Sequence, residues 1–133
     1  TIDQLVEPVD DADVIIRPMK HQEPGLATWV LSRGSSQPGG SMVAKMRITP
    51  ERRTGPGHLS VHPGREWFFV LSGTALLHLG ERQIPVGQGN AAEFSTMIPH
   101  SIGAMNGPVE ILTIFDQDGE RAHAQSSGDA PTS

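Results

Sequence analysis

Apolar and polar residues alternate with a period of two over most of the chain. Between residues 42 and 49, apolar side chains at the even positions alternate with a mixed set at the odd positions, which is typical of a half-buried strand. We expect a first strand to begin at 14–16 and further strands over 27–32, 57–62, 66–71, 74–79, 83–86, 92–95, 100–104 and 109–115. Clusters of Gly, Pro, Asn and Ser separate these segments. The pattern predicts an all-β sandwich or barrel of about ten short strands.

The composition agrees with a single all-β domain. Of 133 residues, 15 are Gly and 11 are Pro, so about a fifth of the positions favour turns. A chain of this length can bury one hydrophobic core. Charged residues make up only 19% of the chain, which argues against a bundle of long surface helices.

Charge and hydrophobicity narrow the range of partners. The formal net charge is −5 and the sequence has no basic run, so these residues by themselves are not expected to bind DNA or RNA. The longest apolar run, residues 67–71, is far shorter than the ~20 residues that span a bilayer. The absence of Cys excludes disulfides and thiolate metal sites, and it favours a reducing compartment. We therefore expect a cytoplasmic protein without a membrane contact.

The chain divides into three parts. Residues 1–13 combine one apolar, helix-like turn with an acidic linker. Because the first residue is not Met, we expect that a segment upstream of it has been removed. Residues 14–118 hold the predicted strands, and residues 119–133 form a polar tail that we expect to be disordered.

A break in one predicted strand favours a shared site for His62 and Glu66. In a continuous strand these two residues would lie about 13 Å apart, which is too far to bind one ion. Pro63 and Gly64 stand between them and are typical of a turn. Such a turn can bring the carboxylate beside the imidazole on a neighbouring strand.

His100 is the third candidate ligand. It follows Pro99, which is disfavoured inside a central strand, so we expect His100 to begin a strand near the mouth of the barrel. Two imidazoles and one carboxylate with open coordination positions suit Fe(II), and they also suit Zn, Mn or Ni. The sequence therefore predicts a divalent metal site at His62, Glu66 and His100.

The period of the strand also predicts which residues line a pocket beside the metal site. If Glu66 faces the cavity, Phe68 and Val70 share its face and line the pocket. Ser60, two residues before His62, adds a polar group to the same face. We therefore assign ligand binding to Ser60, Phe68 and Val70, and we assign no catalytic residue.

Other conspicuous residues are given structural interpretations. Trp67 and Phe69 share the opposite face of their strand, so they are expected to pack against a second sheet or a partner subunit. Residues 51–53, Glu-Arg-Arg, are interpreted as a solvated charge run. His78 alternates with leucines and is interpreted as a half-buried or surface histidine.

Two segments resemble the conserved motifs of the cupin superfamily. Residues 62–73 read His-x3-Glu-x6-Gly and resemble the first motif, and residues 89–100 resemble the second. The resemblance implies a small jelly-roll β-barrel of antiparallel strands whose metal ligands line the inner face. In this chain Ser60 stands where the first motif normally has a His, and Ala104 stands where the second has an Asn. The resemblance therefore leaves three of the four usual ligands.

A narrower resemblance points to a class of regulators. Residues 66–73, 91–94, 99–100 and 119–123 together resemble the C-terminal cupin domain of XRE-type helix-turn-helix regulators. Residues 1–6 resemble the end of the DNA-binding domain that precedes it. The resemblance implies that DNA is bound only through the upstream domain. It also implies that this domain senses a small-molecule effector and forms a homodimer.

Two other functions are compatible with the same residues. A mononuclear Fe(II) oxygenase, epoxidase or metal-dependent isomerase would also use two His and one carboxylate with open positions. A barrel without metal could serve only as a dimerisation module. The metal content of the purified protein distinguishes this last function from the other two.

Overall fold

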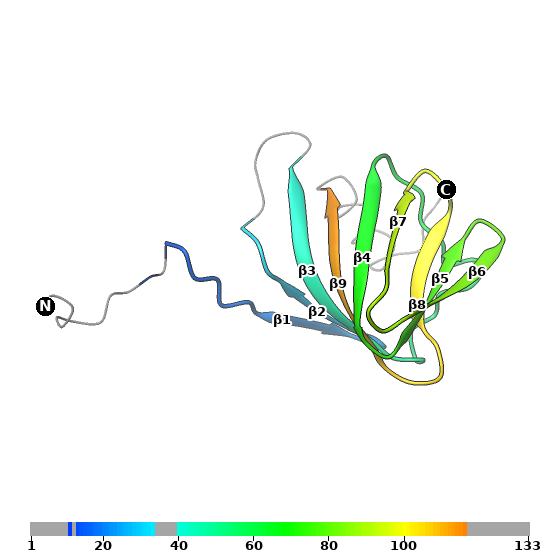
Figure 1. Ribbon diagram of the computed structural model, residues 1–133, viewed down its shortest axis with the longest axis horizontal. Coiled ribbons are helices and arrows are strands. Elements are labelled where there is room, and N and C mark those ends of the chain that lie inside the picture. The colour runs from blue at the N-terminus through cyan, green and yellow to red at the C-terminus, as the bar shows by residue number, and fades with distance from the viewer. Residues whose placement is uncertain (1–10, 12, 34–39, 117–133) are drawn as a thin grey trace, which may run out of the picture.

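The computed structural model describes residues 11, 13–33 and 40–116, which form nine strands in two antiparallel sheets (Figure 1). The strands are β1 (Lys20–Glu23), β2 (Leu26–Val30), β3 (Ser41–Ile48), β4 (Arg65–Ser72), β5 (Thr74–Leu79), β6 (Arg82–Gly87), β7 (Ala91–Ser95), β8 (His100–Ala104) and β9 (Val109–Asp116). The described residues include no helix able to cross a membrane. The helix-like turn predicted near residue 1 and the tail predicted from residue 119 lie outside the described residues.

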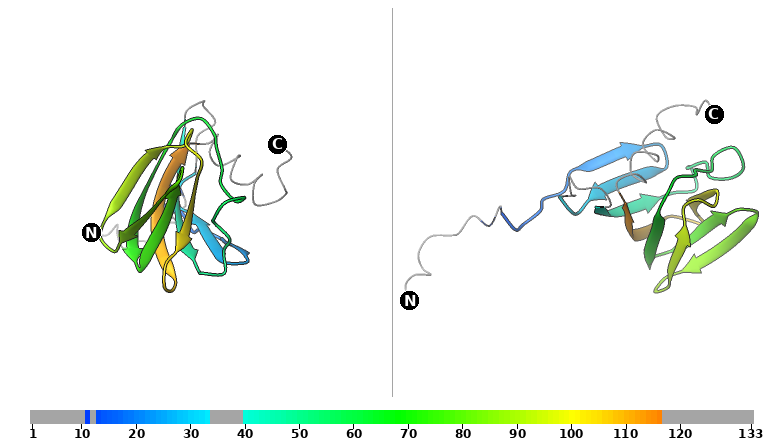
Figure 2. Two further views of the ribbon diagram at one scale, coloured as in Figure 1. Left: turned by 90° about the vertical axis from the view of Figure 1, so that its right-hand side faces the viewer. Right: turned by 90° about the horizontal axis from the view of Figure 1, so that it is seen from above.

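The two sheets form a jelly-roll barrel, which confirms the predicted fold class. One sheet has six strands in the order β1-β2-β3-β9-β4-β7, and the other has three in the order β6-β5-β8. Figure 2 shows the two sheets facing each other. The last of the described strands, β9, lies in the middle of the larger sheet between β3 and β4.

Alternation along the strands explains how the core forms. On β9, every second residue from Val109 to Phe115 is buried, and β3 and β4 show the same period. The main core cluster draws on both sheets: Leu26, Ile48, Phe68, Val70, Ala75, Leu77, Val86, Phe94, Ile102, Val109 and Ile111. The inner faces of the two sheets therefore fill the barrel, while the outer face of the larger sheet stays partly accessible.

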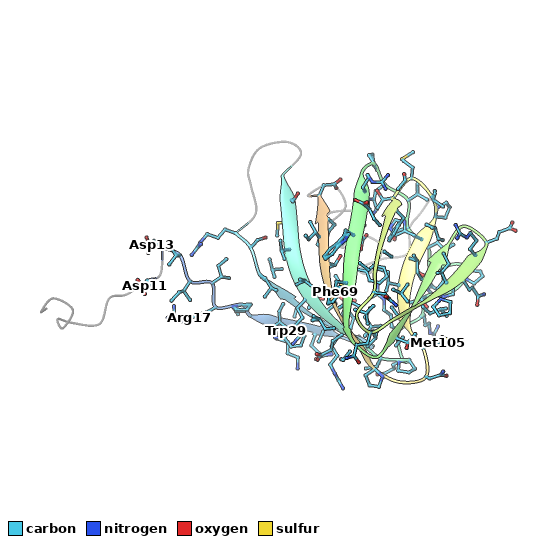
Figure 3. All side chains as sticks on the ribbon, viewed as in Figure 1. Asp11, Asp13, Arg17, Trp29, Phe69 and Met105 are labelled. Atoms are coloured by element: carbon cyan, nitrogen blue, oxygen red, sulfur yellow. The ribbon has the colours of Figure 1, made fainter. Side chains whose placement is uncertain are left out.

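The sequence pattern misplaces the first strand. The predicted strand at 14–16 is wrong, because these residues pair with no strand and Val14 is 67% exposed. Residues 13–19 instead extend away from the barrel, where Figure 3 labels Asp13 and Arg17. The true first strand, β1, was not predicted because its four residues are polar and exposed at the edge of the sheet.

The predicted strand over 57–62 is also wrong, since only Ser60 pairs there, through an isolated bridge to His100. The segment that follows β3 instead crosses the outer side of the three-stranded sheet at Thr54. The Thr54 hydroxyl lies 3.3 Å from Nε2 of His78, and the Ser101 hydroxyl donates to the carbonyl of Thr54. Because the segment around Thr54 lies over His78, His78 is buried rather than half-buried or at the surface.

Candidate metal centre

The chain turns between His62 and Glu66, at Pro63 and Gly64. Gly64 has φ +120°, a conformation that side-chain-bearing residues rarely adopt, and a Cβ there would collide with the carboxylate of Asp116. The backbone N–H of His62 donates to the carbonyl of Thr96 over 2.9 Å, and that of Thr96 donates to the carbonyl of Gly64 over 3.0 Å. These bonds fix the turn and set Glu66 at the start of β4.

Three predicted side chains converge behind this turn. One ligand atom from each of His62, Glu66 and His100 lies within 4.8 Å of the other two, and all three residues are buried. The two imidazole rings meet edge to face with centroids 5.0 Å apart. Oε1 of Glu66 lies 3.8 Å from Nε2 of His100. The structure therefore places the three groups together, and their role as metal ligands remains a prediction.

A backbone carbonyl sets the orientation of His100. Its Nδ1 lies 2.9 Å from the carbonyl oxygen of Ile98. A carbonyl oxygen only accepts hydrogen bonds, so Nδ1 of His100 donates to it. In the neutral ring, Nε2 would then keep its lone pair on the side where Oε1 of Glu66 lies. Metal-binding histidines are commonly oriented in this way. The corresponding contact of His62, from Nδ1 to the carbonyl of Pro63, is longer at 3.5 Å.

Thr113 on β9 holds the carboxylate of Glu66. Its hydroxyl lies 3.4 Å from Oε2 of Glu66 and 3.1 Å from the carbonyl of Trp67, so its one proton is shared between two acceptors. Sequence analysis did not single out Thr113. It lies 47 residues from Glu66 along the chain, and only the pairing of β9 with β4 brings it into contact.

A cationic group also acts on the centre. The interpretation of residues 51–53 as a solvated run is wrong for Arg52, whose Nε is buried and whose backbone packs against Gly25 in the β1–β2 turn. Burial lowers the pKa of the Arg52 guanidinium, while the carboxylates of Glu23 and Glu66 raise it. The guanidinium is therefore within electrostatic reach of Glu66.

The residues predicted to line a pocket lie beside the centre or in the core. Ser60 is paired with His100 across an antiparallel bridge, which places their side chains on the same face. Phe68 and Val70 are fully buried in the main core cluster, on the same face of β4 as Glu66. Their part in binding a ligand stays a prediction.

A surface hollow lies at one end of the larger sheet. Its volume is about 260 Å³, and it is lined by Ser41, Arg65, Glu66, Trp67, Glu93, Ile114, Phe115 and Asp116. Trp67 and Ile114 are paired neighbours on the outer face of this sheet, whereas Glu66 is only 3% exposed.

Residues 44–115 match the family model of the cupin domain. The chain belongs to the cupin family. The match spans both segments in which the sequence resembles the cupin motifs, including His62, Glu66 and His100. Comparison with curated protein sequences gives no match.

Solved structures with the same fold include a regulator and two proteins of other kinds. An HTH_3 family transcriptional regulator from Vibrio cholerae superimposes with a TM-score of 0.59 at 17% identity, over 69% of this chain and 51% of that one. A variant of oxalate decarboxylase from Bacillus subtilis superimposes with a TM-score of 0.61 at 21% identity, over 80% of this chain and 29% of that one. The FeII form of HppE superimposes with a TM-score of 0.58 at 16% identity, over 81% of this chain and 62% of that one. This chain thus spans about half the regulator and under a third of the decarboxylase.

The residues of this cupin centre fit a divalent cation. A cation about 2.0–2.2 Å from nitrogen and oxygen ligands needs donor atoms that lie close together, a deprotonated carboxylate and an imidazole lone pair. His62, Glu66 and His100 supply such a set, and Glu66 is a buried carboxylate whose charge a cation would compensate. With three protein ligands, coordination positions are left for water or another molecule.

Proposed function

We propose that this cupin domain binds a divalent cation and a small molecule in its barrel and acts as the sensor of a bacterial transcriptional regulator. The observation that carries the proposal is the buried cluster of His62, Glu66 and His100. The fold likeness to the Vibrio cholerae regulator supports the regulatory context. DNA would be bound by another domain of the full-length protein, since this chain carries a net negative charge.

An effector shifts an equilibrium only through its different affinities for two states, and we propose that the two states differ in how two copies of the chain associate. The outer face of the larger sheet is suited to a homodimer. Its centre is apolar, and is formed by Val43, Trp67, Phe69, Leu112 and Ile114. Lys45 lies to one side of this centre and Glu93 to the other. A two-fold axis through the centre would bring these opposite charges together.

Metal binding is tested first, with Glu66→Gln as the variant and Glu93→Gln as its control. Glu93 is on β7 with its side chain 61% exposed and is not one of the predicted ligands, so its substitution changes the same charge without removing a ligand. We expect Zn²⁺, Fe²⁺, Mn²⁺ or Ni²⁺ to raise the melting temperature of the wild-type protein and of Glu93→Gln, because a ligand bound only to the native state stabilises it. Glu66→Gln should lose this shift. A wild-type protein that binds none of these metals would exclude both the sensor and the enzyme, and leave the metal-free dimerisation module.

The regulatory role is tested on the full-length protein. We expect loading with the metal that binds most tightly to change its affinity for operator DNA by about 5-fold or more, the lower end of common allosteric couplings. The change should disappear in Glu66→Gln and in the presence of a chelator. A protein that binds metal but whose DNA affinity responds neither to metal nor to small molecules would not be a sensor.

A metalloenzyme is the second candidate, because three protein ligands leave coordination positions for a substrate or O₂. The folds of oxalate decarboxylase and of FeII HppE are similar to that of this chain. This alternative predicts aerobic turnover of a small molecule by the Fe(II)-loaded protein, lost in Glu66→Ala. Turnover without any effect on DNA affinity would favour the enzyme over the sensor.

A further inference from the structure

Positive charge gathers around Trp29 on the outer face of the larger sheet, although the net charge of the chain is −5. In the register of the sheet, Lys20 on β1, Trp29 on β2 and Lys45 on β3 form one row. The ammonium groups of Lys20 and Lys45 lie 5.8 and 5.1 Å from the centre of the Trp29 ring. Arg47 is two residues beyond Lys45 and shares its face of β3. We call these four residues the basic patch.

Neighbouring carboxylates compensate only part of the charge of the basic patch. Oε1 of Glu110 lies 3.8 Å from Nζ of Lys45, and its Oε2 lies 3.9 Å from Nε of Arg47, so two cations share one carboxylate. The side chains of Lys45 and Arg47 stay 37% and 47% exposed, and Lys20 is also exposed. The basic patch is therefore accessible to an acidic partner, and its charge complements one.

A small hollow beside Trp29 adds apolar surface to the basic patch. Its volume is about 100 Å³, and its lining includes Leu26 and Ala27 as well as Lys20, Arg47 and Glu51. The surface thus offers an aromatic ring, aliphatic side chains and charges that are mostly positive. Its chemistry suits a segment that carries both carboxylates and aliphatic side chains.

The residues that precede β1 have this composition. Among residues 11 and 13–19, which we call the arm, Val14 is 67% exposed, Ile15 42% and Met19 78%. Asp11 and Asp13 are exposed as well. In the sequence, residues 7–13 contain four carboxylates and no base. Apolar side chains that lie together in solvent commonly mark a contact surface.

The arm leads away from the barrel of its own copy (Figure 1). The seven residues 13–19 can span up to about 25 Å. Figure 3 labels Asp11 and Asp13 at the outer end of the arm, away from Trp29 on the sheet. The Arg33 guanidinium donates to the carbonyl of Ile15 over 3.2 Å, which ties the arm to the segment after β2. The acidic end of the arm is therefore directed toward a neighbouring molecule.

We propose that two copies of this chain exchange their arms, each arm docking on the basic patch of the other copy. Asp11 and Asp13 pair with lysines of the basic patch, and aliphatic side chains of the arm cover Trp29 and the hollow beside it. The row of Lys20, Trp29 and Lys45 continues into Leu112 at the centre of the proposed homodimer. Arm exchange is thus a second contact of that dimer, and it does not depend on the metal centre.

The test mixes two charge-reversed variants of the full chain. Asp11→Lys/Asp13→Lys makes the arm basic, and Lys20→Glu/Lys45→Glu makes the patch acidic. We expect each variant alone to raise the dissociation constant of the dimer about tenfold or more, because attractive pairs on both arms become repulsive. An equimolar mixture should recover the affinity of the wild type, since each arm then meets a patch of opposite charge. Sedimentation equilibrium measures the dissociation constants.

The mixture separates arm exchange from an arm that folds back on its own copy. A folded-back arm would meet the same mismatched patch whether or not the variants are mixed, so a mixture without recovery would overturn the proposal. We also expect 1 M NaCl to weaken the wild-type dimer, because salt screens exposed pairs.

Glu81→Lys and Arg82→Glu are the controls. Both residues are exposed at the β5–β6 turn, and their substitution changes charge in the same two directions on the other sheet. The controls should dimerise like the wild type. If the arm and patch variants also do so, arm exchange is wrong while the contact through the centre of the sheet stands. A monomeric wild type would exclude both contacts, whereas a failure to bind Zn²⁺ would count against the metal centre alone.

Discussion

At the scale of single residues, the centre depends on side chains that would not touch the metal. The carbonyl of Ile98 orients His100, and the hydroxyl of Thr113 holds Glu66. Such outer contacts set which atom of a ligand faces the cation and keep a buried carboxylate in place. The three ligands alone therefore do not explain the geometry of the site.

Thr113→Val should weaken both the site and the fold. Valine keeps the shape of the side chain but removes the donor to Glu66 and to the carbonyl of Trp67. We expect the free energy of unfolding to fall by about 1 kcal/mol and Zn²⁺ affinity by about tenfold. Urea unfolding and calorimetric titration measure the two effects.

Thr74→Val is the matched control for this substitution. Thr74 is a half-buried strand residue of the three-stranded sheet, and its backbone carbonyl, which valine retains, accepts the N–H of Met105. Its replacement should leave Zn²⁺ affinity unchanged. Equal losses of affinity in the two variants would mean that the Thr113 hydroxyl has no special part in holding Glu66.

How much of the site the sequence predicts depends on how local each contact is. The convergence of His62 and Glu66 was predictable because the turn that joins them lies between them in the chain. The positions of Thr113 and Thr96 were not predictable, because they depend on how β9 and β7 pair with β4. Arg52 was misinterpreted because a run of charges is usually solvated, and only the folded structure shows that its Nε is buried.

At the scale of elements, the turn at Gly64 is the feature that assembles the site. Gly64 combines a positive φ with a neighbouring carboxylate, that of Asp116, where a Cβ would have to lie. The conformation therefore favours glycine, and a Cβ would in addition displace the Asp116 carboxylate.

Gly64→Ala should cost more stability than an otherwise similar glycine substitution. Gly89 also has a positive φ, +84°, but a Cβ added there would meet nothing within 4 Å, so Gly89→Ala reports backbone strain alone. We expect a loss of about 1–3 kcal/mol from strain in either variant, and a further loss in Gly64→Ala from the displaced carboxylate. Urea unfolding measures the difference. Equal losses would show that Asp116 moves aside freely.

Strands were predictable from the sequence where one face is buried and missed where neither face is. The alternation on β3, β4 and β9 is clear because their inner faces fill the barrel. The exposed edge strand β1 carries no such pattern. Residues 57–62 have apolar and polar residues in a strand-like order, yet all but Ser60 lie outside the ladders.

At the scale of the whole molecule, the outer face of the larger sheet is where a second copy is proposed to dock. In the register of the sheet, Ile114 is the neighbour of Trp67 on one side and of Val43 on the other. This row runs across β3, β9 and β4. It is apolar and partly exposed, as residues at the centre of an interface commonly are before association.

Ile114→Glu should convert the proposed dimer into a monomer. A charge in the middle of an apolar contact would be buried without a partner. The control is Met105→Glu, since Met105 has nearly the same exposure, 36% against 37%, and lies between β8 and β9. Sedimentation measures the oligomeric state of the wild type and of both variants. A wild type that is already monomeric would exclude this interface.

The position of β9 has a consequence for how the protein is made. Because the last of the described strands fills the middle of the six-stranded sheet, β3 and β4 have no common neighbour until residues 109–116 have left the ribosome. A nascent chain that stops earlier exposes the unpaired edges of two long strands, which invite association with other chains. Folding of this barrel must therefore wait until these residues have been translated, and chains that end before them should aggregate rather than form a smaller native domain.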